Sequence, residues 1–158
     1  MATTSIPTTA ARIARSMSPV KQFSIFAENR VGRLYDLTTL LKTYDVHIMA
    51  LTVHDTIDSA IIRLIVDDRD KTRELLINND FPYVEREIVV VELPDESQLK
   101  TMLAALLEAE VNLHYFYSFL KRPAELPAIA IHVEEPETAA QALNGRGFKT
   151  LGESDISR

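Results

Sequence analysis

The chain has 158 residues, with 17 basic and 23 acidic side chains and a formal net charge of -6. It contains no cysteine, which excludes disulfides, thiolate metal sites and cysteine nucleophiles. No apolar run approaches the roughly 20 residues of a membrane span, and four glycines are too few for a glycine-rich phosphate loop. The acidic balance also argues against proteins that bind DNA or membrane surfaces through summed positive charge. We therefore expect a soluble, cytoplasmic protein that binds neither nucleic acid nor membrane.

The first 20 residues differ from the rest of the chain. They include Arg12 and Arg15, no acidic residue, and many Ser, Thr and Ala residues. This composition is faintly similar to that of an organelle transit peptide, but no apolar segment long enough for a signal peptide is present. We interpret residues 1–20 as an N-terminal tail or an arm docked on the body.

The remaining chain contains an internal duplication. Leu34, Leu37, Leu41, Val46 and Ile48 recur 65 positions later as Leu99, Met102, Leu106, Val111 and Leu113. Val66, Leu76 and Phe81 recur 67 positions later as Val133, Leu143 and Phe148. Apolar matches at nearly fixed spacing indicate two copies of one structural unit. We predict a first domain at 21–87 and a second at 88–158.

Both copies show the same order of predicted elements. Alternating apolar residues predict strands, whereas Leu34, Leu37 and Leu41 have helical spacing. Asp67 and Asp68 provide N-cap chemistry for a later helix. In chain order, the first copy is predicted to hold a strand at 23–27, a turn at 28–32, a helix from about 33 to 44, strands at 46–53 and 60–66, a helix at 69–79 and a strand at 83–87. In the second copy, Pro136 begins the last helix and Asn144 with Gly145 ends it.

This order of strand, helix, strand, strand, helix and strand is that of the ferredoxin-like unit. The predicted fold class is therefore α+β, with two tandem ferredoxin-like βαββαβ units and helices on one face of each sheet. Both faces of the segment 114–119 are apolar or aromatic. Burial of both faces favours a second chain as the covering layer, so we expect a homodimer.

Candidate catalytic residues are few. The histidines His47, His54, His114 and His132 lie on predicted strands without metal-ligand spacing. Acidic pairs stand at predicted helix starts, where capping explains them. We therefore expect no enzyme, no catalytic residue, no metal and no cofactor.

RNA-recognition modules share this topology, but they need aromatic residues on the open face of the sheet and basic surroundings. The corresponding positions of the third strand are Ile61, Arg63 and Ile65, and both copies are acidic. This comparison does not favour an RNA-binding function.

The turn after the first strand is the best candidate for ligand binding. In the segment AENRVGRL, Gly32 permits a tight turn before a helix that begins near Arg33. The free N–H groups and the positive end of the helix dipole suit a carboxylate ligand. A purely structural turn would need the same glycine, so the residues alone leave both alternatives open.

The chain resembles the ACT-domain family, small regulatory modules that bind amino acids and other small metabolites. The resemblance covers about residues 21–151 and is carried by two pairs of motifs: ENRVGRL with YDVHIMAL in the first copy, and LPDESQL with AEVNLHYF in the second. In this family, two units commonly pair edge to edge through their second strands and bind ligand at the interface. The resemblance therefore implies that the two units form one extended antiparallel sheet.

The resemblance also implies a ligand site. In the serine-sensing ACT pair of phosphoglycerate dehydrogenases, a first-loop asparagine faces a second-strand asparagine, and Asn29 and Asn112 match these positions. The implied site consists of Asn29, Arg30, Val31, Gly32, Arg33, Leu34, Val111, Asn112 and Leu113. At the reciprocal position, Asp95 and His47 form a degenerate second site. The chain departs from the family where Val31 replaces the usual proline and Ser97 replaces the expected glycine.

A tandem ACT protein of this kind implies a regulator that senses a free amino acid or similar small metabolite at the interface between its two copies. The alternative is a regulatory subunit that acts by protein–protein contact with a metabolic enzyme, with or without a ligand, as the small subunit of acetolactate synthase does. The second half of that subunit is not an evident ACT copy, which counts against close kinship.

Overall fold

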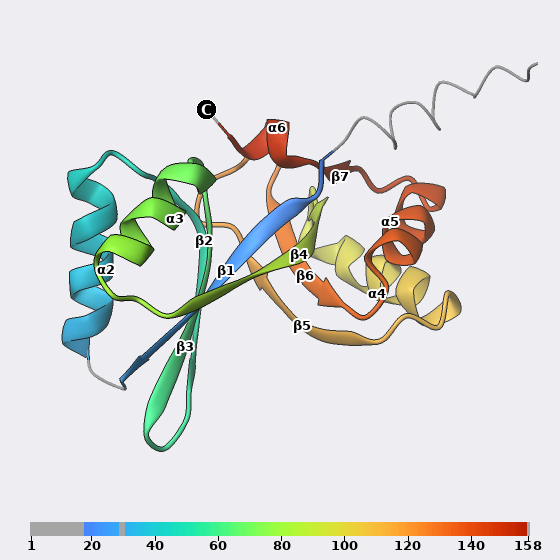
Figure 1. Ribbon diagram of the computed structural model, residues 1–158. Helices are drawn as coiled ribbons and strands as arrows, with labels where there is room; N and C mark the ends of the chain where they lie inside the picture. Colours follow the sequence, from blue (N-terminus) through green and yellow to red (C-terminus); the bar gives the residue numbers. More distant parts are fainter. Residues whose placement is uncertain (1–17, 29–30, 158) are drawn as a thin grey trace, which may run out of the picture.

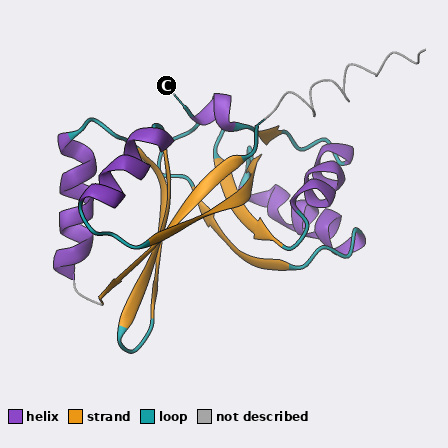
Figure 2. Ribbon diagram, in the orientation of Figure 1, coloured by secondary structure: helices purple, strands orange, loops and turns teal. Residues whose placement is uncertain are grey.

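The computed structural model describes residues 18–28 and 31–157 (Figure 1). Figure 2 shows the strands gathered between two groups of helices. The elements are β1 (Val20–Glu28), α2 (Val31–Thr43), β2 (Ile48–Asp55), β3 (Ser59–Val66), α3 (Arg69–Asn78), β4 (Tyr83–Glu92), the 3-10 helix η1 (Glu96–Gln98), α4 (Leu99–Glu108), β5 (Leu113–Ser118), β6 (Ala128–Val133), α5 (Pro136–Gly145), β7 (Thr150–Leu151) and α6 (Glu153–Ile156). Helix α2 begins at Val31, two residues earlier than predicted.

The strands form one seven-stranded antiparallel sheet in the order β2-β3-β1-β4-β6-β5, with β7 paired to β4. Strand β4 belongs to both halves of this sheet: residues 83–88 pair with β1, and residues 89–92 pair with β6. Each half therefore has the ferredoxin-like strand order, and the two ferredoxin-like units and the α+β class are confirmed. The predicted division between residues 87 and 88 lies inside this one continuous strand.

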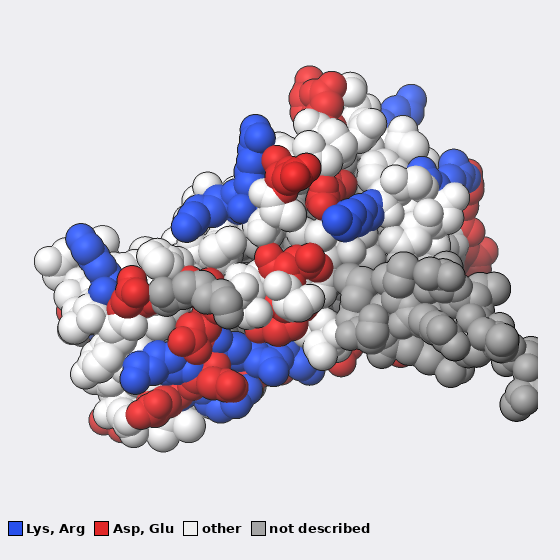
Figure 3. All heavy atoms as spheres, turned by 90° about the horizontal axis from the view of Figure 1, so that it is seen from above, with Lys and Arg blue, Asp and Glu red and all other residues white. Residues whose placement is uncertain are grey.

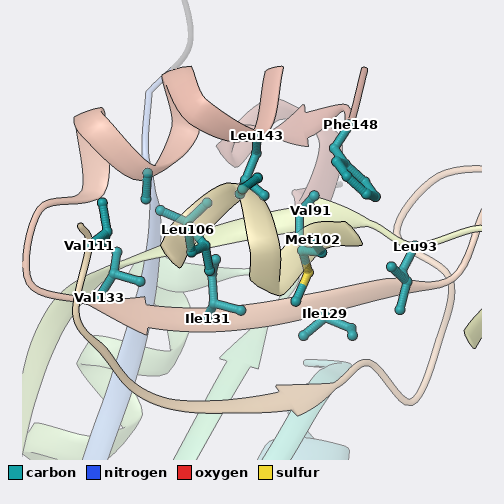
Figure 4. Close-up of a cluster of buried hydrophobic side chains, with 13 residues drawn as sticks. Val91, Leu93, Met102, Leu106, Val111, Ile129, Ile131, Val133, Leu143 and Phe148 are labelled. Atoms are coloured by element: carbon teal, nitrogen blue, oxygen red, sulfur yellow. The ribbon is translucent and has the colours of Figure 1, made fainter. Parts of the chain in front are cut away.

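Each unit packs its two helices on one face of its half of the sheet. In Figure 1, α2 and α3 lie on one side of the molecule and α4 and α5 on the other. The first helix–sheet core includes Phe23, Leu37, Leu41 and Leu64, each with no exposed surface. The second core joins α4, α5, β4 and β6, and Figure 4 shows its side chains converging from these elements. Repeat-related Leu37 and Met102, and Leu41 and Leu106, are buried in the two cores, as the shared pattern predicts.

The helix-free faces of the two units pack against each other within the chain. Because strand residues alternate between faces, Ile88 and Val90 of β4 join the contact between the units, whereas Val89 and Val91 face the helices of the second unit. The inter-unit cluster consists of Val20, Met49, Ala50, Ile65, Ile88, Val90, Tyr117, Ala128, Ala130, Leu151 and Ile156. The sheet is therefore curled rather than flat.

This packing corrects one prediction about the aromatic strand β5. Tyr117 is buried in the inter-unit cluster, and Tyr115 and Phe119 pack against it. The layer that the sequence analysis assigned to a second chain is thus provided by the first unit of the same chain. A homodimer stays a prediction, but this strand no longer argues for it.

The second strands of the two units meet only briefly. β2 and β5 stand at opposite ends of the strand order, and the curl brings them together at one bridge, Ala50–Phe119. The Leu120 N–H donates to the Met49 carbonyl at 2.8 Å beside this bridge. The units are joined mainly through β4 and their helix-free faces, not along their second strands.

The four long helices end in the same way, with a residue of positive φ shortly after the last helical residue. Asp45, Asp80 and Glu110 each have φ of 57°, and Gly147 has φ of 86°. Each of these residues follows one of the four long helices, in the left-handed conformation that commonly ends a helix. Helix α5 begins at Pro136 and ends at Gly145, as predicted, and the left-handed residue Gly147 follows two positions later.

On the face drawn in Figure 3, acidic and basic side chains are interspersed. Over residues 18–28 and 31–157, no helix is long and apolar enough to cross a bilayer.

Candidate ligand-binding sites

The predicted first-loop residues lie at the start of α2. Asn29 and Arg30 are outside the described residues. Val31 is 87% exposed, and a Cβ atom at Gly32 would meet no atom within 4 Å. The Arg33 guanidinium lies 4.1 Å from the centre of the Phe81 ring, while Leu34 packs against the first core. Val31 and Gly32 are therefore open to solvent, whereas Arg33 and Leu34 are half-buried.

The predicted second-strand residues lie in the second unit and are mostly structural. Val111 is buried in the helix–sheet core, and Leu113 packs against it. The Asn112 Nδ2 atom donates to the Glu134 carboxylate at 2.8 Å, and the Glu134 N–H donates to the Asn112 carbonyl at 3.1 Å. Asn112 thus connects the start of β5 to the residue that follows β6.

His47 has the same role in the first unit. Its N–H donates to Asp67 Oδ1 at 2.8 Å, and its Nδ1 lies 2.8 Å from Asp67 Oδ2. The Asp67 N–H donates back to the His47 carbonyl at 3.1 Å. The pair His47–Asp67 and the pair Asn112–Glu134 are repeat-related clasps between the second strand and the end of the third. Their shared geometry accounts for both residues without a ligand.

Within one chain, these groups of residues do not come together. Val31, Gly32, Arg33 and Leu34 belong to α2, which Figure 1 places on the opposite side of the molecule from the beginning of β5. The physical reason is the shared strand β4, which limits the meeting of the second strands to the bridge at Ala50. Ligand binding by the predicted residues stays a prediction, and it would require contact between two copies of the chain.

Asp95, the other residue of the degenerate second site, stands at the start of η1 and α4. Its carboxylate accepts a hydrogen bond from the Ser97 hydroxyl at 2.7 Å, and this bond is the main cause that lowers the pKa of Asp95. Asp95 and His47 lie in different units. The structure therefore gives them separate local roles.

A pocket lies beside this loop of the second unit. It has a volume of about 250 Å³ and is formed by the end of β4, the start of α4, and the loop between α5 and β7. The backbone is held there by a hydrogen bond from the Glu92 N–H to the Lys149 carbonyl at 2.9 Å. Its lining residues are Glu92, Pro94, Gln98, Thr101, Leu126, Arg146, Gly147, Phe148 and Lys149.

Glu92 is the unusual residue of this pocket. It is only 6% exposed, although it carries a carboxylate at the end of an apolar strand. Its ion pair with Lys149 is loose, with the Lys149 Nζ atom 3.7 Å from Oε1 and the Lys149 side chain 67% exposed. Burial of a carboxylate is costly unless it is paired and hydrogen-bonded. The pocket therefore offers an acceptor suited to a positively charged ligand group.

Two basic side chains complete the charges of the pocket. Lys149 is paired with Glu92, and Arg146 is paired with Glu108 on α4. Sequence reasoning missed Glu92, Arg146 and Lys149. The acid that ends the run IVVVE was a usable signal, because a charged residue in an apolar strand calls for a partner.

The chain matches the family model of the ACT domain pair over residues 18–155. It belongs to this family. The identification made from the loop and strand motifs is thereby confirmed. None of the curated proteins matches this chain.

Solved structures agree with the assignment to the ACT domain pair. Protein BT0572 from Bacteroides thetaiotaomicron is 28% identical, with a TM-score of 0.80, covering 89% of this chain and 96% of its own. The regulatory subunit of aspartate kinase from Thermus thermophilus, in a ligand-free form, is 12% identical, with a TM-score of 0.56, covering 81% of this chain and 92% of its own. The corresponding subunit from Thermus flavus is 13% identical, with a TM-score of 0.54, covering 84% and 94%. At these identities the two kinase subunits share the fold of this ACT domain pair.

Proposed function

We propose that this ACT domain pair is a regulatory protein whose ligand is a free amino acid or a similar small acid, bound in the pocket beside residues 94–98. The family supports a regulatory role, and the buried, loosely paired carboxylate of Glu92 is the observation that carries the choice of ligand. The protein regulated is proposed to be a metabolic enzyme that contacts the pair.

An amino acid fits the chemistry of this pocket. Its ammonium group can donate to Glu92, and its carboxylate can accept from Lys149 or Arg146, both of which line the pocket. Pro94, Leu126 and Phe148 provide apolar surface for the side chain of the ligand. A free amino acid is much smaller than the drug-sized ligands of pockets of roughly 300–1,000 Å³, and a volume of about 250 Å³ accommodates it.

Occupancy of this pocket would act on the contact between the units. Glu92 ends the strand β4 that both units share, and Lys149 precedes β7, which pairs with β4. A ligand that joins these two segments would change the relative stability of alternative packings, and a partner enzyme would respond to the favoured one.

The test is thermal unfolding of the full chain with each of the twenty amino acids at millimolar concentration. A ligand that binds only the folded state stabilises it by RT ln(1 + [L]/Kd), about 2.7 kcal/mol at a hundredfold excess over Kd. We expect one amino acid, or a few related ones, to raise the unfolding midpoint. The Glu92→Gln variant should lose this response, because it keeps the shape of the side chain and removes its charge.

Glu87→Gln is the matched control, since Glu87 lies on the same strand but is exposed and paired with Lys21 at 3.6 Å. This variant should keep the full response. If no amino acid shifts the midpoint of the wild-type protein, the proposal fails and the alternative, regulation by protein contact alone, is favoured. An equal response from both variants would show that the amino acid binds elsewhere.

A further inference from the structure

The contact between the two units changes from apolar to polar along its length. Beyond the inter-unit cluster, Gln22 stands opposite Arg86 in the pairing of β1 with β4, and Ser24 stands opposite Arg63 in the pairing of β1 with β3. From the second unit, Tyr115 stands opposite His132 in the pairing of β5 with β6. We call Gln22, Arg63, Arg86, His114, Tyr115 and His132 the polar end of the inter-unit contact.

Hydrogen bonds and ring contacts hold part of this region in place. The Gln22 amide nitrogen donates to the Tyr115 hydroxyl at 2.8 Å. The Arg63 guanidinium lies 4.0 Å from the centre of the Tyr115 ring, and that ring stacks on His132 at 4.8 Å between centroids. The His114 ring lies 5.0 Å from the His132 ring between centroids. The groups are therefore fixed in position by aromatic contacts rather than by ion pairs.

The positive charges here are not neutralised. Over residues 18–28 and 31–157, neither Arg63 nor Arg86 forms an ion pair with a carboxylate, although the protein is acidic overall. Elsewhere in the described chain, Arg33, Arg73 and Arg146 do form ion pairs with acids, as Arg73 does with Glu85 at 2.9 Å. A region that carries positive charges without nearby acids attracts anions from solution.

Two buried donor or acceptor atoms are also unsatisfied. The Nε atom of Arg63 and the Nδ1 atom of His132 are buried without a hydrogen-bond partner in the described part of the chain. An unsatisfied buried polar atom destabilises the folded state by about 1–3 kcal/mol, so each such atom calls for an explanation. The two atoms come from different units and face the same contact.

The groups around His132 also indicate that a negative charge is missing from this region. Burial is the main cause that lowers its pKa, and the charges of His114, Arg86 and Arg63 lower it further. The charged groups that lower this pKa, His114, Arg86 and Arg63, are all basic side chains. Arg86 and His114 are exposed, so the region is open to solvent at its edge.

We propose that the polar end of the inter-unit contact binds a small anion that carries a carboxylate or phosphate group, held by Arg63 and Arg86 of the first unit and His132 of the second. The anion accepts hydrogen bonds from the Arg63 Nε–H, from the Arg86 guanidinium and from an N–H at Nδ1 of His132. It thereby satisfies both buried atoms and links the units on the face opposite the helices. This site is separate from the pocket at Glu92 and does not rest on the amino-acid proposal.

Inorganic phosphate and succinate are the two probes, and sodium chloride at matched ionic strength controls for general screening. We expect saturable stabilisation of the full chain against thermal unfolding by at least one probe, beyond the effect of chloride. Stabilisation by phosphate alone or by succinate alone assigns the chemical class of the anion. No stabilisation beyond that of chloride by either probe would overturn the proposal.

The variants locate the site. Arg86→Gln removes an exposed charge and should weaken binding of the probe roughly tenfold or more, as expected for a charged hydrogen bond. Arg122→Gln makes the same change of charge at an exposed position whose Nη1 atom donates to the Glu125 carbonyl at 3.3 Å, and it should bind as the wild type does. Equal binding by these two variants would place the anion elsewhere and overturn the proposal.

A second readout separates binding from a loss of folding. Histidine resonances followed by NMR against pH should show a higher pKa for His132 when the probe is saturating, because a bound anion favours the protonated ring. An unchanged titration of His132 under saturation would contradict the site. Glu92→Gln should leave these results unaltered, so failure here and failure of the amino-acid proposal remain distinguishable.

Discussion

Tyr117 of the second unit donates its hydroxyl to the amide oxygen of Gln22 in the first unit, over 2.6 Å. Gln22 has no exposed surface, and Tyr117 is buried as well. Burial raises the pKa of Tyr117 well above its usual range, so the hydroxyl stays protonated and acts as a donor at neutral pH. The amide nitrogen of Gln22 is satisfied by Tyr115. Both the oxygen and the nitrogen of the buried Gln22 amide therefore form hydrogen bonds to the second unit.

Replacing Tyr117 by Phe should therefore destabilise the protein. The variant leaves the Gln22 amide oxygen buried without its donor, which costs about 1–3 kcal/mol, or roughly 2–4 °C in unfolding midpoint per kcal/mol for a chain of this size. Tyr35→Phe, on a side chain that is 70% exposed, should change the midpoint by much less. Equal midpoints for the two variants would show that the hydroxyl does not stabilise the contact between the units.

The pairs His47–Asp67 and Asn112–Glu134 occupy equivalent positions in the two units, but they should contribute different amounts to the stability of the protein. Asp67→Ala removes a buried carboxylate that accepts two hydrogen bonds from His47 and should destabilise the protein by about 1–3 kcal/mol. Glu134→Ala removes an exposed carboxylate that accepts from Asn112 and should change stability by roughly 0.5 kcal/mol or less. Urea denaturation of both variants measures this difference, and equal losses would contradict it.

Stability should depend on pH through His132. Its pKa in the folded state lies below the unfolded value, so the unfolded chain binds more protons in the window between these two values. Its contribution is fully present above the unfolded value near 6.5 and is lost as the pH falls toward the folded value. His132 faces Arg63 on β3, Arg86 on β4 and His114 on β5, all of which oppose its protonation.

Urea denaturation from pH 5 to pH 7.5 tests this dependence on His132. The His132→Gln variant should lose less stability on acidification than the wild type does. His54→Gln, at an exposed position near the β2–β3 turn, is the control and should keep the wild-type slope. Glu153 contributes with the opposite sign, because burial raises its pKa and favours the folded state at lower pH. A wild-type slope in His132→Gln would contradict the assignment.

The site implied by the family resemblance has its own test. If Asn29 binds the ligand, Asn29→Ala should abolish the amino-acid response of the wild-type protein, whereas Asp95→Ala should spare it. If the pocket at Glu92 binds the ligand, Asn29→Ala should respond as the wild type does. Equal losses in Asn29→Ala and Asp95→Ala would contradict a single site in the first loop. Isothermal titration with the amino acid found by thermal unfolding measures the wild-type protein and both variants.

Local patterns in the sequence were sufficient to predict the fold of each unit. Helical spacing at Leu34, Leu37 and Leu41 predicted α2 because these side chains must share one buried face. Asp68 was predicted as an N-cap, and its carboxylate accepts from the Lys71 N–H at 3.0 Å. Asp67, assigned the same kind of role, instead accepts from His47, because the contact with the start of β2 is long-range and leaves no local pattern.

The arrangement of the units could not be predicted in the same way. The segment from Tyr83 to Glu92 contains no glycine or proline, so one continuous strand could have been predicted there. The curl of the sheet depends instead on which face of each unit finds a partner, a choice made by contacts between residues as distant as Gln22 and Tyr117. The pocket at Glu92 likewise arises from segments distant in sequence.

The shared strand also restricts how this chain can change in length. Even-numbered residues such as Ile88 and Val90 face the other unit, and odd-numbered residues such as Val89 and Val91 face the helices. One residue inserted between Ile88 and Val89 would exchange these two sets throughout the second half of β4. Insertions in the loops carry no such penalty, and the second copy has in fact gained two residues there. The boundary between the copies is therefore the position least tolerant of insertion or deletion, the reverse of a flexible linker.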